Sequence, residues 1–81
     1  MPLTEILSPL PGTFYRSPSP DAPPFVTEGA QVRAGDVIGL VEVMKQFSEV
    51  HAESDGLVVR VAVASGESVE PGQTLVVIET P

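Results

Sequence analysis

The sequence has 81 residues, with eleven Asp and Glu against four Lys and Arg, and its formal charge is −7. This acidity argues against nucleic acid and anionic membrane as partners, because both require clustered Lys and Arg. The absence of cysteine excludes disulfides and thiolate metal sites and is typical of a reducing compartment. The apolar stretches are too short to span a bilayer, and the first residues lack the pattern of a signal peptide. We therefore expect one small soluble domain, residues 1–81, in the cytoplasm.

The N-terminal third predicts two short strands and a stiff loop. Glu5–Ser8 are expected to form the first strand, and Thr13–Arg16 the second, because β-branched and aromatic residues favour strands. Residues 17–24 contain four prolines, which cannot donate ladder hydrogen bonds and which restrict the backbone. This segment therefore predicts a semi-rigid projecting loop, after which Phe25–Val26 are expected to resume the sheet.

The remainder of the chain indicates an all-β fold. Glycines recur at short intervals, and no window keeps helical apolar spacing over three turns. Valine, isoleucine and leucine instead come in short runs or alternate with other residues, as in Leu57–Val63. Short strands with frequent turn signals are typical of a β-sandwich or barrel.

An internal repeat divides the sequence into two halves. Residues 32–42 match residues 69–79 at a constant offset of 37, with Val, Gly and Glu identical at three positions. Upstream, Gly12 pairs with Gly56 at an offset of 44, so the first half carries seven extra residues, where the proline-rich loop lies. Two halves of this size cannot each bury a core, which predicts that they pack together with approximate twofold symmetry.

Lys45 is the only lysine, and it lies where one half passes into the other. The apolar run 37–41 precedes it and an alternating run begins at Phe47, which predicts a hairpin with Lys45 at its exposed tip. A single lysine is most often a solvated charge. The symmetry of the chain about this point favours a functional handle, and it places the tip and the two termini at opposite ends of the domain.

The sequence contains no catalytic constellation. His51 is the only histidine, and without cysteine it cannot complete a zinc site or a nucleophilic dyad of the usual kind. The eleven carboxylates are spread through turns, and the glycines form no phosphate-binding loop followed by a helix. We therefore expect no enzyme activity from the chain by itself.

Two segments resemble those of a known family, the biotin carboxyl carrier proteins of bacterial acetyl-CoA carboxylase. Glu42-Val43-Met44-Lys45-Gln46 is similar to the Glu-Ala-Met-Lys-Met motif in which these biotinyl domains present their target lysine. Residues 12–22 resemble the thumb, a protruding insertion that most biotinyl and lipoyl domains lack. The similarity runs from about Ile6 to Glu79, and the thumb, expected at about residues 15–24, coincides with the seven extra residues of the repeat.

The resemblance implies a fold and a function. The fold is a flattened β-barrel, or barrel-sandwich hybrid, of two quasi-symmetric four-stranded antiparallel sheets. Biotin protein ligase would attach biotin to Lys45; biotin carboxylase and a carboxyltransferase would then use the carried ring in turn, as in the acetyl-CoA carboxylase of fatty acid biosynthesis. The chain would be a non-catalytic carrier subunit, because a long tether raises the effective concentration of a reactive group at two distant sites.

The resemblance also assigns site residues around Lys45. Met44 and Val43 would fix the hairpin and offer a small apolar surface to the ligase, and Ser17 of the thumb would touch the biotin ring. Val43 stands where the family has Ala, and Gln46 where it has a second Met. Two alternatives remain open: a lipoyl-type carrier, whose lysine usually follows an acidic residue and which lacks a thumb, and an unmodified barrel that acts as an interaction domain.

Overall fold

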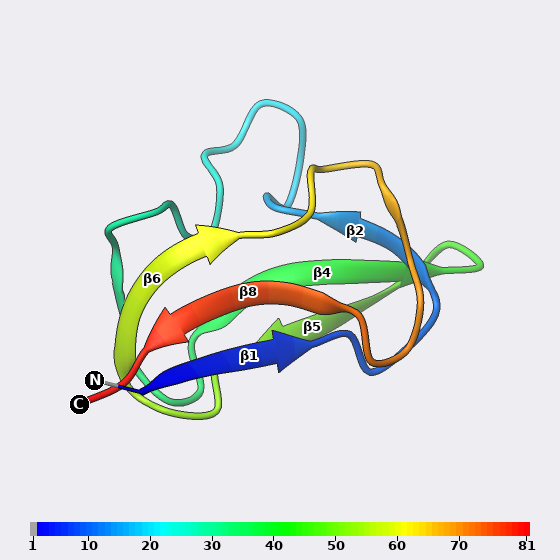
Figure 1. Cartoon of the computed structure of the whole chain (residues 1–81). Coiled ribbons are helices and arrows are strands. Elements are labelled where there is room, and N and C mark those ends of the chain that lie inside the picture. The colour runs from blue at the N-terminus through cyan, green and yellow to red at the C-terminus, as the bar shows by residue number, and fades with distance from the viewer. Residues whose placement is uncertain (1) are drawn as a thin grey trace.

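The computed structural model describes residues 2–81, and within this range it contains eight strands and no helix (Figure 1). Met1 lies outside the described residues. No helix of the described chain could therefore cross a membrane. The strands in chain order are β1 (Leu3–Leu7), β2 (Gly12–Tyr15), β3 (Gln31–Val32), β4 (Val37–Val43), β5 (Gln46–His51), β6 (Gly56–Val61), β7 (Ser68–Val69) and β8 (Thr74–Glu79).

The strands form two four-stranded antiparallel sheets, which confirms the predicted fold class. Their orders are β1-β8-β6-β3 and β5-β4-β2-β7. Each sheet takes two strands from each half of the sequence repeat, so neither half forms a sheet of its own. The two halves are interleaved, and neither could bury its apolar side chains without the other.

The core lies between the two sheets. Phe14, Ile38, Leu75 and Ile78 are at most 1% exposed and belong to a single buried cluster. Strands β4 and β8 have a partner on each side, and each buries four consecutive residues. Their long apolar runs in the sequence are explained by this central position, since both faces of a covered strand must be apolar.

The structure confirms the twofold repeat in detail. Gly29 and Gly66 have φ values of 91° and 90°, and Gly35 and Gly72 have φ values of 95° and 83°. The amide of Gly29 donates to Val58 O at 2.8 Å, and the amide of Gly66 donates to Phe14 O at 2.7 Å. The glycine pairs are spaced by 37 residues and the two acceptors by 44, which are the two offsets of the sequence. The turns as well as the strands are therefore repeated.

The hairpin and the chain ends lie at opposite ends of the molecule, as symmetry predicted. Figure 1 shows the β4–β5 turn at one end and the N- and C-termini together at the other. The amide of Thr80 donates to Pro2 O at 2.9 Å, which holds the two terminal segments side by side.

Three predicted strands differ from those of the structure. The first strand is Leu3–Leu7 and not Glu5–Ser8, because Leu3 and Thr4 pair with the end of β8. The second is Gly12–Tyr15 and not Thr13–Arg16, because Gly12 pairs with Val69, while Arg16 bonds to Ser65 and Phe25 outside the ladder. Phe25–Val26 form no strand, although Val26 is buried in the core. The edge of β2 that they would need is already occupied, since Phe14 N donates to Glu67 O at 2.9 Å on that side.

The connection between β2 and β3 is the longest loop of the fold. The first residues of β2 and β3 are Gly12 and Gln31, and those of β6 and β7 in the other half are Gly56 and Ser68. The chain between the first two is seven residues longer than the chain between the second two. The extra residues make the loop that projects from the sandwich in Figure 1, drawn in cyan. The predicted proline-rich projection is confirmed.

Candidate functional site: the Lys45 hairpin and the cavity beside it

The site begins with a two-residue turn between β4 and β5. Val43 pairs with Gln46, which leaves only Met44 and Lys45 in the loop, with φ values of 50° and 67°. Two-residue hairpins of type I′ require positive φ at both central residues and usually contain Asn or Gly there. Each non-glycine residue in this conformation costs about 1–2 kcal/mol. The flanking strands therefore hold two residues in a conformation that their side chains disfavour.

The hairpin presents Lys45 to solvent without an ionic partner. Met44 is 92% exposed, Gln46 is exposed, and Val43 is half-buried against the core. Within residues 2–81 the one ion pair is His51 with Glu49, at 3.2 Å, so Lys45 has no carboxylate partner. The amine is therefore accessible to another molecule, and Val43 anchors the turn beneath it.

Three side chains follow one another on the outer face of the sheet next to the hairpin. Glu42 pairs with Phe47 on β5 and with Thr13 on β2, and Tyr15 lies two residues further along β2, opposite Leu40. The rings of Tyr15 and Phe47 are 6.1 Å apart between centroids and inclined by 53°. This spacing is within the range in which aromatic rings attract each other. The two strands that flank β4, β2 and β5, are thus connected across it by aromatic contact.

Glu42 lies beside the hydroxyl of Tyr15. Hydrogen bonding to its carboxylate, the negative charge of that carboxylate and slight desolvation raise the pKa of the Tyr15 phenol above its ordinary value. The phenol therefore stays neutral to a higher pH than a free tyrosine does.

A cavity of about 420 Å³ lies between this aromatic pair and the projecting loop. Tyr15 and Phe47 line it from the sheet, and residues 17–20 line it from the loop. Ser65 and Gly66, in the turn before β7, complete it. Most of its lining is apolar, because aromatic and proline rings dominate it. The arrangement suits an apolar group that carries a few hydrogen-bonding atoms.

The structure brings only part of the predicted site together. Ser17 lines the cavity, and its hydroxyl donates to Ser19 O at 2.9 Å, which leaves its oxygen available as an acceptor. The predicted residues Val43, Met44, Lys45 and Gln46 lie on the hairpin and do not line the cavity. Sequence reasoning missed Tyr15, Glu42 and Phe47. A two-residue loop at Met44 and Lys45 fixes the pairing of Glu42 with Phe47. This register is the feature of the sequence from which the position of these two residues beside each other could have been predicted.

The neck of the loop is closed by Arg16. Its amide donates to Ser65 Oγ at 2.8 Å, and its carbonyl accepts from the amide of Phe25 at 2.7 Å. Its guanidinium reaches Val26 O at 3.5 Å. Both ends of the loop and the turn containing Ser65 are therefore tied to one residue, which fixes the direction in which the loop projects.

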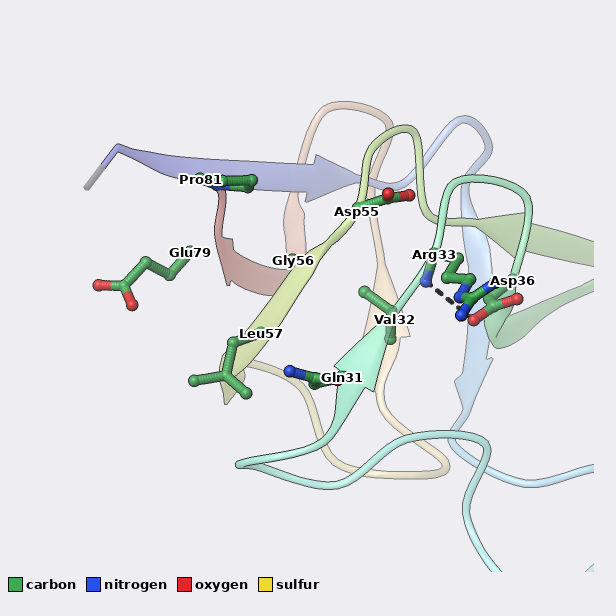
Figure 2. Close-up of a pocket in the computed structure, with 9 residues that line it drawn as sticks. All are labelled: Gln31, Val32, Arg33, Asp36, Asp55, Gly56, Leu57, Glu79 and Pro81. Carbon is green, nitrogen blue, oxygen red and sulfur yellow. Dashed lines mark hydrogen bonds between the residues drawn. The ribbon is translucent and has the colours of Figure 1, made fainter.

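A larger cavity lies elsewhere and has a structural explanation. It measures about 630 Å³ and lies at the end of the molecule that carries the termini, beside Glu79 and Pro81 (Figure 2). Its two aspartates are used in turns: Asp36 Oδ2 accepts from Arg33 N at 2.9 Å, and Asp55 Oδ1 accepts from Ala34 N at 2.9 Å. Figure 2 shows the first of these bonds. This cavity is a groove between capped turns, remote from Lys45.

Comparison with known proteins gives the same family. The model of the biotin/lipoyl family, described as "Biotin-requiring enzyme", matches residues 4–78. The chain is 43% identical over 74 residues to the biotin carboxyl carrier protein of acetyl-CoA carboxylase from Haemophilus influenzae, covering 91% of this chain and 48% of that protein. It is 40% identical over 77 residues to the protein of the same name from Nostoc sp., covering 95% of this chain and 42% of that protein. The chain thus spans less than half the length of these two relatives.

Solved structures of similar fold are parts of large carboxylases. The urea carboxylase of Kluyveromyces lactis matches with a TM-score of 0.79 and 26% identity, over 98% of this chain and 6% of that one. A single-chain, multi-domain long-chain acyl-CoA carboxylase matches with a TM-score of 0.78 and 28% identity, over 93% of this chain and 7% of that one. With the family match over residues 4–78, these likenesses show that the chain belongs to the biotin/lipoyl family of biotin-requiring enzymes.

Proposed function

We propose that this chain is the biotin carboxyl carrier domain of an acetyl-CoA carboxylase-like enzyme, with biotin joined to Lys45. The observation that carries the proposal is the turn: the only lysine of the sequence is fully presented at a two-residue hairpin, unpaired among the described residues. The names of the relatives, biotin carboxyl carrier proteins of acetyl-CoA carboxylase, support the choice of biotin over a lipoyl group. Residues 1–81 then act as one biotinyl domain, with its thumb at about residues 15–24.

The residues present fit this cofactor. An exposed amine can form an amide with the carboxyl group of biotin, as the Lys45 nitrogen replaces the activated carboxyl's leaving group and loses a proton. A ligase needs the amine to be reachable, and the 92% exposure of the neighbouring Met44 shows how open the tip is. Bound biotin supplies a ureido nitrogen that accepts and releases a carboxyl group. The chain itself binds, presents and shelters that ring.

Division of labour explains why the chain needs no catalytic residues. Biotin carboxylase and a carboxyltransferase would do the chemistry at two separate sites, and the domain would move the tethered group between them. The net charge of −7 keeps such a mobile carrier soluble. We place it in the cytoplasm, because a cysteine-free chain suits a reducing compartment.

The test is the intact mass of the protein after co-expression with a biotin protein ligase, followed by peptide mapping. We expect one biotinoyl increment on Lys45 and none on Lys45→Arg, which keeps the charge but cannot be acylated. A matched control combines Lys45→Arg with Arg33→Lys, which moves the single lysine to another exposed turn. An increment on this variant would mean that exposure alone suffices. An unmodified wild-type chain would favour the barrel as a pure interaction domain.

A further inference from the structure

Phe47 is an exposed aromatic residue that the fold does not explain. It lies two residues after Lys45, and 58% of it is exposed. A side chain this exposed gains little from burial, while a large apolar surface beside a functional residue usually serves to bind something. One side of its ring makes the tilted contact with Tyr15, which leaves the rest of the ring open to another molecule.

The repeat supplies an internal comparison. At the equivalent positions of the other sheet, Leu3 takes the place of Phe47 and Glu79 that of Glu42, while a bulge between Val58 and Arg60 puts Arg60 opposite Val77, where Tyr15 would stand. Leu3 is 62% exposed, and Arg60 is exposed. The fold therefore accepts side chains without an aromatic ring at both positions. The aromatic pair is present only in the half that carries Lys45 and the long loop, and it is not a requirement of the strands.

The exposed ring of Phe47 faces the cavity beneath the loop. That cavity, of about 420 Å³, has the aromatic pair on one side and Pro18 and Pro20 on the other. Two residues of extended chain span at most about 7 Å, so a group on the long side chain of Lys45 can reach the ring of Phe47. Ser17, at the rim, retains an acceptor oxygen that could receive an N–H.

We propose that Phe47, in contact with Tyr15, is a positioning residue: its ring forms the sheet-side wall on which the group carried by Lys45 rests between reactions. This inference rests on the proposed function and adds a residue outside the lysine motif and the thumb. The wall is apolar and open on one side, so the contact is weak and reversible. The carried ring is sheltered from solvent in one state and free to reach a partner enzyme in the other.

The test compares the protein before and after loading with biotin, by NMR. We expect the ring signals of Phe47 and Tyr15 to shift on loading and to show cross-relaxation with biotin protons. Phe47→Ala is expected to lower the ratio of resting to free biotin about fivefold, since the apolar contact with the ring is lost. Phe47→Leu, which copies Leu3 of the other half of the repeat, is expected to give a ratio of resting to free biotin between those of the wild type and Phe47→Ala. Leu3→Ala removes the equivalent exposed side chain at the far end and should change nothing.

Each outcome decides the inference. Unchanged Phe47 and Tyr15 signals in a chain whose mass shows biotin on Lys45 would overturn this role while leaving the carrier function standing. The same holds if Leu3→Ala reduces the resting population as much as Phe47→Ala. A chain that is never biotinylated would overturn both proposals, and the mass identifies that case. If Phe47→Ala disturbs the hairpin, the Phe47→Leu variant, whose side chain the repeat already tolerates, provides the same comparison.

Discussion

Tyr15 and Glu42 lie on the neighbouring strands β2 and β4, and hydrogen bonding to the Glu42 carboxylate together with its negative charge raises the pKa of the Tyr15 phenol. This interaction connects the start of the projecting loop to the strand that carries the hairpin. Glu42 also belongs to the motif that precedes Lys45, which gives this carboxylate a role inside the domain as well as any role toward a partner.

The interaction of Tyr15 with Glu42 predicts a specific pH dependence. The pKa of Tyr15 is raised by Glu42, so the folded state holds the phenol proton more tightly than the unfolded state. Below about pH 10 the phenol is neutral in both states and its contribution to stability is fully present. As the pH rises through the raised folded pKa, that contribution is lost. Tyr15 is the only tyrosine and there is no tryptophan, so tyrosinate absorbance reports this titration directly.

Glu42→Gln is expected to bring the Tyr15 titration back toward about pH 10, because the amide can still accept the bond but carries no charge. Glu79→Gln serves as the matched control, since Glu79 is the repeat equivalent of Glu42 and Arg60 stands opposite Val77 where Tyr15 would be. Equal midpoints for wild type and Glu42→Gln would show that Glu42 does not set the pKa of Tyr15.

Met44→Asn is expected to stabilise the fold by about 0.5–1 kcal/mol. Met44 has a φ of 50° and is 92% exposed, so the substitution relieves backbone strain and removes almost no packing. Asn tolerates this conformation better than Met and is common in two-residue hairpin turns. The measurement is the free energy of unfolding in urea. Gln46→Asn, one pair away at a residue without positive φ, should bring no gain. A loss of stability in Met44→Asn would mean that the turn is not strained at this position.

The fold could be predicted from sequence because its two halves repeat. The matching runs around Gly35 and Gly72 predict the turns, and the difference between the two offsets predicts the projecting loop. The tip position of Lys45 followed from the flanking strand patterns. Phe25–Val26 were misassigned because an apolar pair can end in a sheet or fill a core, and only the tertiary pairing of β2 with the β7 turn decides between them.

The cavity could not be predicted in the same way. It is made by residues from three separate segments, β2 with the thumb, β5, and the turn at Ser65, and no local pattern brings these together. Phe47 reads in the sequence as an ordinary residue of an alternating strand. Its position next to Tyr15 depends on the antiparallel register on both sides of β4, which needs the sheet order as well as the loop length.

The repeat predicts equal effects from Gly35→Ala and Gly72→Ala. Both glycines have positive φ, of 95° and 83°, and an added Cβ would meet nothing within 4 Å at either position. The cost is therefore backbone strain alone, about 1–2 kcal/mol for each substitution. The turns lie in different halves, so the double variant should lose about the sum of the two. Urea unfolding of the three variants checks this. A difference between the single variants larger than about 1 kcal/mol would show that the repeated turns are not energetically equivalent.

Deleting residues 17–23 is expected to leave a folded domain with a lower rate of carboxyl transfer. None of these residues belongs to the buried core, and the hydrogen bonds of Ser17 and Ala22, both to Ser19 O, stay within the segment. The other half of the repeat closes the same connection without them. The neck between Arg16 and Phe25 is retained.

Circular dichroism and urea unfolding measure the fold of this deletion variant, and a reconstituted carboxylase measures transfer. Val26→Ala is the informative comparison, because Val26 follows the same loop but is 8% exposed and part of the core. It should cost about 1–3 kcal/mol of stability and leave the cavity intact. A deletion variant that unfolds would make the thumb a structural element of the sandwich. A folded variant with an unchanged rate of carboxyl transfer would show that the thumb has no role in the transfer, since loss of its shelter for the carried group would not affect the reaction.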